Sequence, residues 1–131
     1  MSSPILSLVV PCYNEEEMLP MAADILKQKL TSLILQEKIS TKSFICFVDD
    51  GSSDNTWAII SDLHEGDNIF TGIKLSRNRG HQNAVLAGLM TVKEISDAVI
   101  SLDADLQDDV NAIDEMIEKY AEGCQIVFGV R

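Results

Sequence analysis

Three oxygen-bearing side chains follow one apolar stretch of the chain at intervals of two residues. Asp103, Asp105 and Gln107 come directly after residues 98–102. Side chains two residues apart in an extended segment lie on the same side of it. Carboxylate and amide oxygens suit Mg²⁺ or Mn²⁺, which often complete their shells with substrate phosphate oxygens. The spacing predicts a metal–diphosphate site, and the competing interpretation is that an aspartate after a strand only caps the next helix.

A second acidic group follows another apolar run, residues 44–48. It begins with Asp49 and Asp50 and continues as Gly-Ser-Ser. These are common turn residues, so the string alone fits an ordinary turn as well as a binding loop. Like charges gathered at one sheet edge are costly unless a cation or hydrogen-bond donors compensate them. The two acidic groups together therefore predict a partner, such as a small anionic ligand bridged to the protein by a metal ion.

A third group follows the first apolar run and contains Pro11, Tyr13 and Glu15. Tyr13 offers an aromatic face, and Glu15 could accept hydrogen bonds from ribose hydroxyls. An equally good interpretation makes Tyr13 a core residue and Glu15 an acid in the first turn of a helix. Asn14 is a favourable N-cap residue, so we expect the helix to open at the three glutamates that follow it.

The basic residues near a predicted strand end gather in residues 77–81, Arg-Asn-Arg-Gly-His. This string precedes a predicted helix, whose N-terminus would favour an anion. Arg77 is therefore a candidate contact for a phosphate or a phosphate-bearing acceptor, although solvated loop charges explain the string nearly as well. His81 is equally a capping or surface residue. We expect His64, near the end of another predicted helix, to be a favourable dipole partner.

The elements that position these groups alternate between strands and helices. The predicted strands span residues 5–10, 44–48, 69–75, 98–102 and 125–130. Between them, helical periodicity covers residues 18–33, 54–63, 82–93 and 111–122, with Gly66 and Gly123 as stops. Such alternation predicts an α/β fold with a mostly parallel sheet covered by helices on both faces, a three-layer Rossmann-like unit. Ligands of such sheets bind beyond the carboxyl ends of the strands.

Composition narrows the classes of function. The chain has 131 residues, and 21 acidic against 10 basic residues give a formal charge of −11, which would repel nucleic acids. The apolar runs are too short to span a bilayer, and the start of the chain lacks the features of a secretory signal. Three cysteines without Cys-x-x-Cys spacing predict reduced thiols. We expect a single unit, residues 1–131, in the cytoplasm.

Four strings give a more specific indication when they are taken in order. They are VVPCYNEEE, VDDGSSDNT, LSRNRGHQNAVLAGL and SLDADLQDD. Together they resemble family 2 glycosyltransferases of the GT-A fold, over essentially the whole chain. The likeness is closest to the branch that transfers a sugar from a UDP- or GDP-sugar to a polyprenyl phosphate, dolichyl or undecaprenyl.

This resemblance implies roles for the residues described above. It implies that Asp103 and Asp105 are the catalytic carboxylates and, with Gln107, hold Mg²⁺ or Mn²⁺ and the diphosphate. Arg131 is implied to approach phosphate. The expected nucleotide-sugar contacts are Pro11, Tyr13, Glu15, Asp49, Asp50, Arg77, Asp103 and Arg131.

Family 2 catalytic domains extend well past this length. The resemblance therefore implies that residues 1–131 are the N-terminal, nucleotide-sugar-binding part, with the sheet cut after about five strands. We expect the acceptor site, its general base and any membrane-associated helices to follow Arg131. The expected acceptor is a lipid phosphate or a saccharide, at the cytoplasmic face of a membrane. An open sheet edge would also favour a homo-oligomer.

Two rival interpretations remain at this stage. A non-catalytic nucleotide-sugar-binding module would carry the same residues. A signalling receiver domain is also a five-stranded α/β unit with an acidic metal pocket, but its acidic pair follows the first strand and a lysine closes the fifth. Here Pro11 follows the first predicted strand, which favours the glycosyltransferase interpretation.

Overall fold

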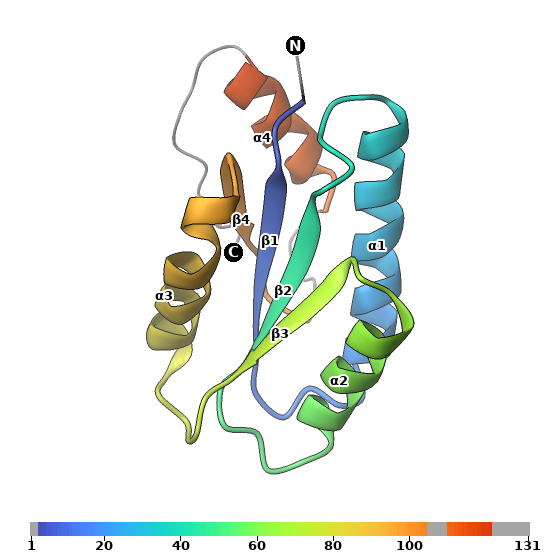
Figure 1. The fold of residues 1–131 in the computed structure, drawn as a ribbon. Coiled ribbons are helices and arrows are strands. Elements are labelled where there is room, and N and C mark those ends of the chain that lie inside the picture. The colour runs from blue at the N-terminus through green and yellow to red at the C-terminus, as the bar shows by residue number, and fades with distance from the viewer. Residues whose placement is uncertain (1–2, 105–109, 122–131) are drawn as a thin grey trace.

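The sheet of the protein is entirely parallel over the part that the structure describes. The computed structural model describes residues 3–104 and 110–121. Its strands are β1 (Leu6–Cys12), β2 (Phe44–Asp49), β3 (Phe70–Lys74) and β4 (Ala98–Ser101). They lie in the order β3-β2-β1-β4, and every neighbouring pair is parallel (Figure 1). The predicted strand 125–130 lies outside the described residues.

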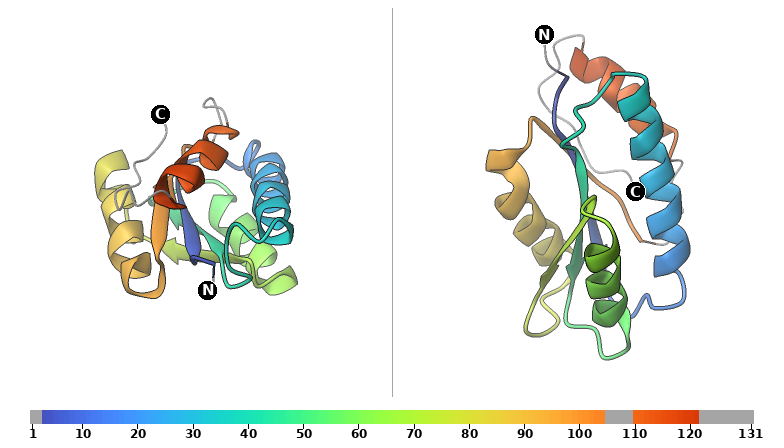
Figure 2. Two further views of the ribbon diagram at one scale, coloured as in Figure 1. Left: turned by 90° about the horizontal axis from the view of Figure 1, so that it is seen from above. Right: turned by 45° about the vertical axis from the view of Figure 1, so that its right-hand side comes forward.

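Helices cover both faces of this sheet. They are α1 (Leu19–Leu35), α2 (Thr56–Gly66), α3 (His81–Val92) and α4 (Ala112–Ala121), with a 3₁₀ turn, η1 (Lys93–Ile95), after α3. Figure 2 shows α1 and α2 on one side of the sheet and α3 on the other. Helix α4 shares the core of the α1 side through Ile113 and Ile117. The predicted three-layer α/β/α Rossmann-like architecture is confirmed.

The alternation of side chains along the strands produces two cores. In β1, Leu8 and Val10 belong to the large core under α1, α2 and α4, whereas Val9 belongs to the smaller core under α3. Helix α3 lies especially close to the sheet at Gly88, where an added Cβ would come within 2.5 Å of a Val9 methyl carbon. A strand buried on both faces needs a nearly continuous apolar sequence, which β1 has except at Ser7, whose buried hydroxyl is hydrogen-bonded to that of Ser96.

The strand order creates a switch point between β1 and β4. The chain builds β1, β2 and β3 outward in one direction and then returns to place β4 on the other side of β1. Loops that leave β1 and β4 therefore diverge at the carboxyl edge, where ligands of such sheets bind. The same order excludes the receiver interpretation, because receivers order their strands 2-1-3-4-5.

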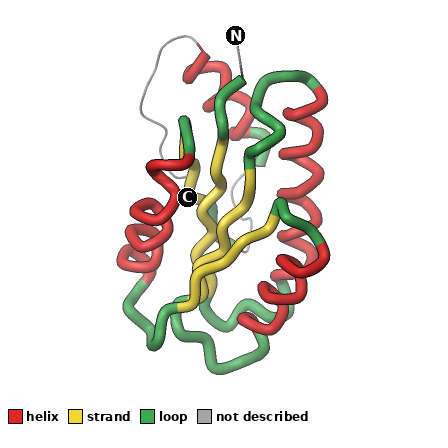
Figure 3. The backbone as a smooth tube through the Cα atoms, viewed as in Figure 1, coloured by secondary structure: helices red, strands yellow, loops and turns green. Residues whose placement is uncertain are grey.

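The start of α1 differs from the prediction. The helix begins at Leu19, with Met18 in the N-cap position, and its first turn contains no acidic residue. The expected N-cap Asn14 instead has a left-handed backbone conformation, with φ 52°. Residues 13–18 form a loop before the helix, and the three glutamates lie in it (Figure 3). The hydroxyl of Thr56, at the start of α2, and the carboxylate of Asp54, just before it, hold this loop by accepting the N–H groups of Glu15 and Glu16.

Two further predictions concern the membrane and the cysteines. Within residues 3–104 and 110–121, none of the helices is both long and apolar enough to cross a bilayer. Cys12 and Cys46 are free thiols, as predicted, and the structure shows that both are buried, whereas Cys124 lies outside the described residues. Burial raises the pKa of Cys46 to about 11. Burial also raises the pKa of Cys12, and the nearby carboxylates of Glu15 and Asp49 raise it further.

Candidate functional site

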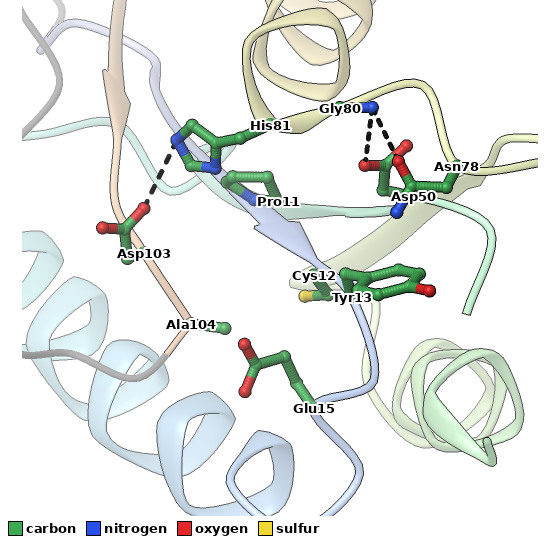
Figure 4. Close-up of a pocket in the computed structure, with 10 residues that line it drawn as sticks. All are labelled: Pro11, Cys12, Tyr13, Glu15, Asp50, Asn78, Gly80, His81, Asp103 and Ala104. Atoms are coloured by element: carbon green, nitrogen blue, oxygen red, sulfur yellow. Dashed lines mark hydrogen bonds and ion pairs between the residues drawn. The ribbon is translucent and has the colours of Figure 1, made fainter. Parts of the chain in front are cut away.

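A cavity of about 320 Å³ opens at the switch point, against the carboxyl ends of β1 and β4. Its lining comes from the ends of three strands and from the N-terminal end of α3 (Figure 4). The lining residues are Pro11, Cys12, Tyr13, Glu15, Asp50, Asn78, Gly80, His81, Asp103 and Ala104. Residues widely separated in the sequence thus form one site, as the positions after the strands predicted.

Asp103 and His81 face each other across this cavity. His81 Nε2 lies 3.6 Å from Asp103 Oδ1, and the two side chains are 49% and 32% exposed. In Figure 4, the Glu15 carboxylate points toward the Asp103–Ala104 segment from the opposite wall. Since Asp103 is neither deeply buried nor closely bonded to His81, its carboxylate is accessible to a ligand.

The predicted metal ligands divide between described and undescribed residues. Asp103 borders the cavity, whereas Asp105 and Gln107 lie outside the described residues. Among residues 3–104 and 110–121, no group of three His, Cys, Asp or Glu side chains is arranged to hold a metal ion. The partly exposed Asp103 carboxylate is a hard oxygen donor of the kind that Mg²⁺ and Mn²⁺ accept, so it fits the predicted metal as one ligand.

Asp50 lines the cavity and also holds the backbone that enters α3. Its carboxylate accepts hydrogen bonds from the N–H groups of Arg79, at 2.7 Å, and Gly80, at 3.1 Å. Gly80 has φ 94°, a conformation that glycine adopts without strain. The carboxylate thereby satisfies two donors next to the helix N-terminus and keeps His81 on the cavity wall.

Gly51 allows two loops to cross at close range. Its φ is 73°, and an added Cβ would lie 2.3 Å from both the carbonyl carbon of Arg77 and the nitrogen of Asn78. The loop after β3 therefore runs directly over the loop after β2. The predicted phosphate contact Arg77 is exposed at this crossing, and its side chain is not among the residues that line the cavity.

Asp49 occupies a different position from its neighbour. It is fully buried at the end of β2, and its Oδ1 accepts a hydrogen bond from the Ser52 N–H at 3.1 Å. Its Oδ2 is buried without a hydrogen-bond partner in the part of the chain that the structure describes. The structure therefore places Asp50, but not Asp49, on the cavity wall.

Residues 52–56 hold the loop after β1 through side-chain contacts that the sequence analysis missed. The Thr56 hydroxyl accepts the Glu15 N–H at 2.9 Å and donates to Asp54 Oδ1 at 2.5 Å. The other Asp54 oxygen accepts the Glu16 N–H at 3.3 Å. The polar sequence of residues 52–56, which contains an acidic residue and no basic one, was the available signal for these contacts. The same sequence fits an ordinary turn equally well.

These contacts also affect the acidity of Asp54. Partial burial would raise its pKa, but hydrogen bonds from the Thr56 hydroxyl, from the Thr56 N–H and from the Glu16 N–H outweigh this effect. The net result is a pKa below the ordinary value for an aspartate. Asp54 thus stays ionised and acts as a hydrogen-bond acceptor for the loop of Glu16.

Comparison with known proteins adds information about the family of this chain. An uncharacterized glycosyltransferase of Bacillus subtilis (strain 168), YkoT, is 50% identical over 130 residues, which is 99% of this chain and 39% of the relative. A prophage bactoprenol glucosyl transferase homolog of Escherichia coli (strain K12) is 36% identical over 126 residues, or 96% of this chain and 39% of the relative. The bactoprenol glucosyl transferase of Shigella phage SfV is also 36% identical, over 96% of this chain and 38% of its own length.

The chain thus spans about two fifths of the length of these curated relatives. A family model described as glycosyl transferase family 2 matches residues 7–131. The match includes the ends of β1, β2 and β4, from which most of the cavity is built. With the parallel sheet, the cavity at its switch point and this match over nearly the whole sequence, the chain belongs to glycosyl transferase family 2.

Proposed function

We propose that this chain binds the nucleotide-sugar donor of a glycosyltransferase, a UDP- or GDP-sugar, together with Mg²⁺ or Mn²⁺. The observation that carries the proposal is the cavity at the switch point, where Tyr13, Glu15 and Asp103 come together. A nucleoside diphosphate sugar needs a surface for the base, an acceptor for the ribose hydroxyls and positive charge for the diphosphate. The cavity offers the first two directly and a carboxylate that could bring in the third as a metal ion.

The nucleoside half of the donor would lie against the end of β1. Tyr13 is 46% exposed, so its ring has a free surface on which a base can stack. Glu15 borders the same cavity and supplies a carboxylate for the ribose, while Pro11 closes the wall beside it. Asp50 lines the cavity next to these residues, and Asp49 supports the same loop from its buried position.

The diphosphate half would lie toward the end of β4. Asp103 would hold the metal there, with Asp105 and Gln107 completing the carboxylate and amide set predicted from the sequence. The metal would supply positive charge that neutralises the departing nucleoside diphosphate. Arg77 and Arg131 remain the proposed basic contacts for phosphate.

For the whole protein, we propose that the acceptor is a polyprenyl phosphate. Two of the relatives have names that specify bactoprenol glucosyl transfer, which supports a lipid acceptor over a saccharide. A phosphate oxygen of the acceptor would attack the anomeric carbon as the bond to the nucleoside diphosphate breaks, with inversion of configuration. Because such a phosphate is already ionised near neutral pH, this step makes little demand for a general base.

The site of reaction follows from the proposed substrates. A polyprenyl phosphate is a membrane lipid and a nucleotide sugar is a cytoplasmic metabolite, so the reaction belongs at the cytoplasmic face of a membrane. We propose that membrane association and the acceptor site come from sequence beyond residue 131. The alternative that the chain acts only as a nucleotide-sugar-binding module predicts the same donor binding without transfer.

Calorimetric titration tests the donor proposal. The protein is titrated with UDP, GDP and their sugars in the presence of Mn²⁺ and again in EDTA. We expect one nucleotide to bind, and EDTA to weaken its binding at least tenfold. A folded protein that binds none of these nucleotides would contradict the proposal. Transfer to a short-chain polyprenyl phosphate, measured with residues 1–131 replacing the matching part of the Escherichia coli relative, separates the enzyme from the binding module.

A further inference from the structure

Asn14 lies between two residues that line the cavity but does not line it itself. Tyr13 and Glu15 contribute to the wall, whereas Asn14 is exposed beside it. Its φ of 52° is uncommon for a residue with a side chain, although asparagine accepts the left-handed region better than most. The chain therefore changes direction between the two side chains that would meet the nucleoside.

A reciprocal pair of contacts holds Asn14 in this conformation. Its Oδ1 accepts the Ser53 N–H at 2.9 Å and the Ser53 hydroxyl at 3.3 Å. Its own N–H donates to the Ser52 hydroxyl oxygen at 2.8 Å. Both side chain and backbone of Asn14 are thus bonded to the loop after β2, a segment 38–39 residues away along the chain.

The neighbours of Asn14 depend on this anchoring for their positions. The Tyr13 ring is nearly half exposed, so core packing contributes little to its placement. The Glu15 N–H is bonded to the hydroxyl of Thr56, the first residue of α2, which directly follows the loop that holds Asn14. Orienting groups before the ligand arrives avoids paying their ordering entropy during binding, which increases affinity.

We propose that Asn14 is a positioning residue for the nucleoside: its side chain, bonded to Ser53, and its backbone N–H, bonded to Ser52, fix Tyr13 and Glu15 on the cavity wall. This inference rests on the proposed function of the site. It assigns to Asn14 an effect on affinity that acts through Tyr13 and Glu15, without contact between Asn14 and the ligand.

Three substitutions separate the side-chain contact from the backbone conformation. Asn14→Gly keeps the left-handed conformation available and removes the side-chain acceptor. Asn14→Asp keeps an acceptor oxygen of the same length, and Asn14→Ala removes the acceptor while disfavouring the conformation. We expect Gly and Ala to weaken nucleotide binding about tenfold, and Asp to stay within about threefold of the original affinity. If the backbone conformation alone mattered, the Asn14→Gly variant would bind the nucleotide with the original affinity, and Asn14→Asp would bind it no more tightly than Asn14→Gly.

A matched control exists at the far end of α1. Glu37 is the other described non-glycine residue with positive φ, at 61°, and it does not line the cavity. We expect Glu37→Gly and Glu37→Ala to leave nucleotide affinity unchanged. Ser52→Ala removes the acceptor of the Asn14 N–H. We expect it to weaken nucleotide binding, as Asn14→Gly does.

The measurements are nucleotide titration and hydrogen exchange of the Ser53 and Glu15 amides, with a melting curve for every variant. Faster amide exchange and weaker binding in a folded Asn14→Gly protein, with recovery in Asn14→Asp, support the inference. Equal affinity of the original protein and Asn14→Gly overturns the inference and leaves the proposed function standing. Absence of nucleotide binding by the original protein overturns the proposed function and this inference with it.

Discussion

The two sides of the cavity use their polar groups in opposite ways. One side is formed by residues 13–16 and 50–56, which follow β1 and β2 and which we call the braced corner. There, side chains of each segment bond to the backbone of the other, as Thr56 does to Glu15 and Asn14 does to Ser53. On the side where β4 ends, Asp103 meets His81 only at 3.6 Å, and both remain accessible.

This difference shows that polar residue content is a poor guide to which residues meet a ligand. The string Asp-Asp-Gly-Ser-Ser-Asp-Asn-Thr, residues 49–56, is among the most polar stretches of the chain. Most of its described hydrogen bonds hold neighbouring loops, including those of Asp50 to Arg79 and Gly80. A corner held by hydrogen bonds between loops, next to an accessible carboxylate, would favour ligand binding, because fewer groups have to be ordered when the ligand arrives.

The largest expected effect comes from forcing the braced corner apart. Gly51→Ala would introduce a Cβ 2.3 Å from the backbone of Arg77 and Asn78, at a φ of 73° that alanine disfavours. Because backbone, rather than a flexible side chain, must move, we expect a loss of about 3 kcal/mol or more in the free energy of unfolding. Urea unfolding measures it.

Gly66→Ala is the matched control for this substitution. An added Cβ at Gly66 meets nothing within 4 Å, and the residue lies at the end of α2. Alanine is the better helix former, so we expect stability to stay the same or rise by up to about 1 kcal/mol. Equal losses at the two glycines would mean that the crossing of the loops contributes nothing special to stability.

The next effect concerns the open side. Asp103→Asn should weaken metal-dependent nucleotide binding about 100-fold, since an amide is a poorer ligand for a hard cation than a carboxylate. The melting temperature should change little, because the Asp103 side chain is a third exposed and lies 3.6 Å from its partner. Titration in Mn²⁺ and in EDTA gives the affinity, and a thermal scan gives the stability.

Asp97→Asn provides the same change in charge at the other end of β4. Asp97 accepts the Ile5 N–H at 2.8 Å and is far along the strand from the cavity, and asparagine keeps an acceptor oxygen. We expect nucleotide affinity to be unchanged there. If Asp97→Asn and Asp103→Asn lost similar affinity for the nucleotide, the cause would be the change in net charge. Asp103 would then have no specific role in binding the metal.

The smallest effect is a shift in the titration of one carboxyl in the braced corner. Asp54 has a lowered pKa despite partial burial, because Thr56 and Glu16 donate hydrogen bonds to it. The folded pKa lies below the unfolded value of about 3.9, so this contribution to stability is present above that pH. It is lost as the pH falls through the folded pKa.

Thr56→Val removes the hydroxyl donor while nearly preserving the shape of the side chain. We expect the Asp54 pKa to rise toward its ordinary value, as followed by carboxyl carbon NMR. Thr56→Ser, which keeps the hydroxyl, should leave the pKa low. If Thr56→Val left the Asp54 pKa unchanged, the hydroxyl contact would not be the cause that we assign to it.

Much of the fold could be predicted because its signals are local. The run Leu6–Cys12 is apolar except for Ser7, and the structure buries it on both faces as β1. The alternation of such runs with helical periodicity indicated a parallel sheet, and the rule that ligands bind at carboxyl ends indicated the edge at which the cavity opens. Tyr13, Glu15 and Asp103 were singled out by their positions after strands and now line one cavity.

The errors arose where distant loops determine local structure. Asn14 satisfies every local criterion for an N-cap, yet it bonds to Ser52 and Ser53 and the helix starts at Leu19. Asp49 and Asp50 are adjacent and chemically identical, but one is buried beneath the loop and the other lines the cavity. Sequence spacing contains no information that separates them.

By itself, then, the sequence determined the class of fold, the edge of the sheet at which the cavity opens and the family to which the chain belongs. These depend on hydrophobic periodicity and on strings of neighbouring residues, which are properties of short segments. The tertiary structure decided which polar residues hold loops and which face the cavity. That choice depends on contacts such as Asn14 with Ser53 and Asp50 with Gly80, 39 and 30 residues apart, which exist only once the sheet has brought the loops together.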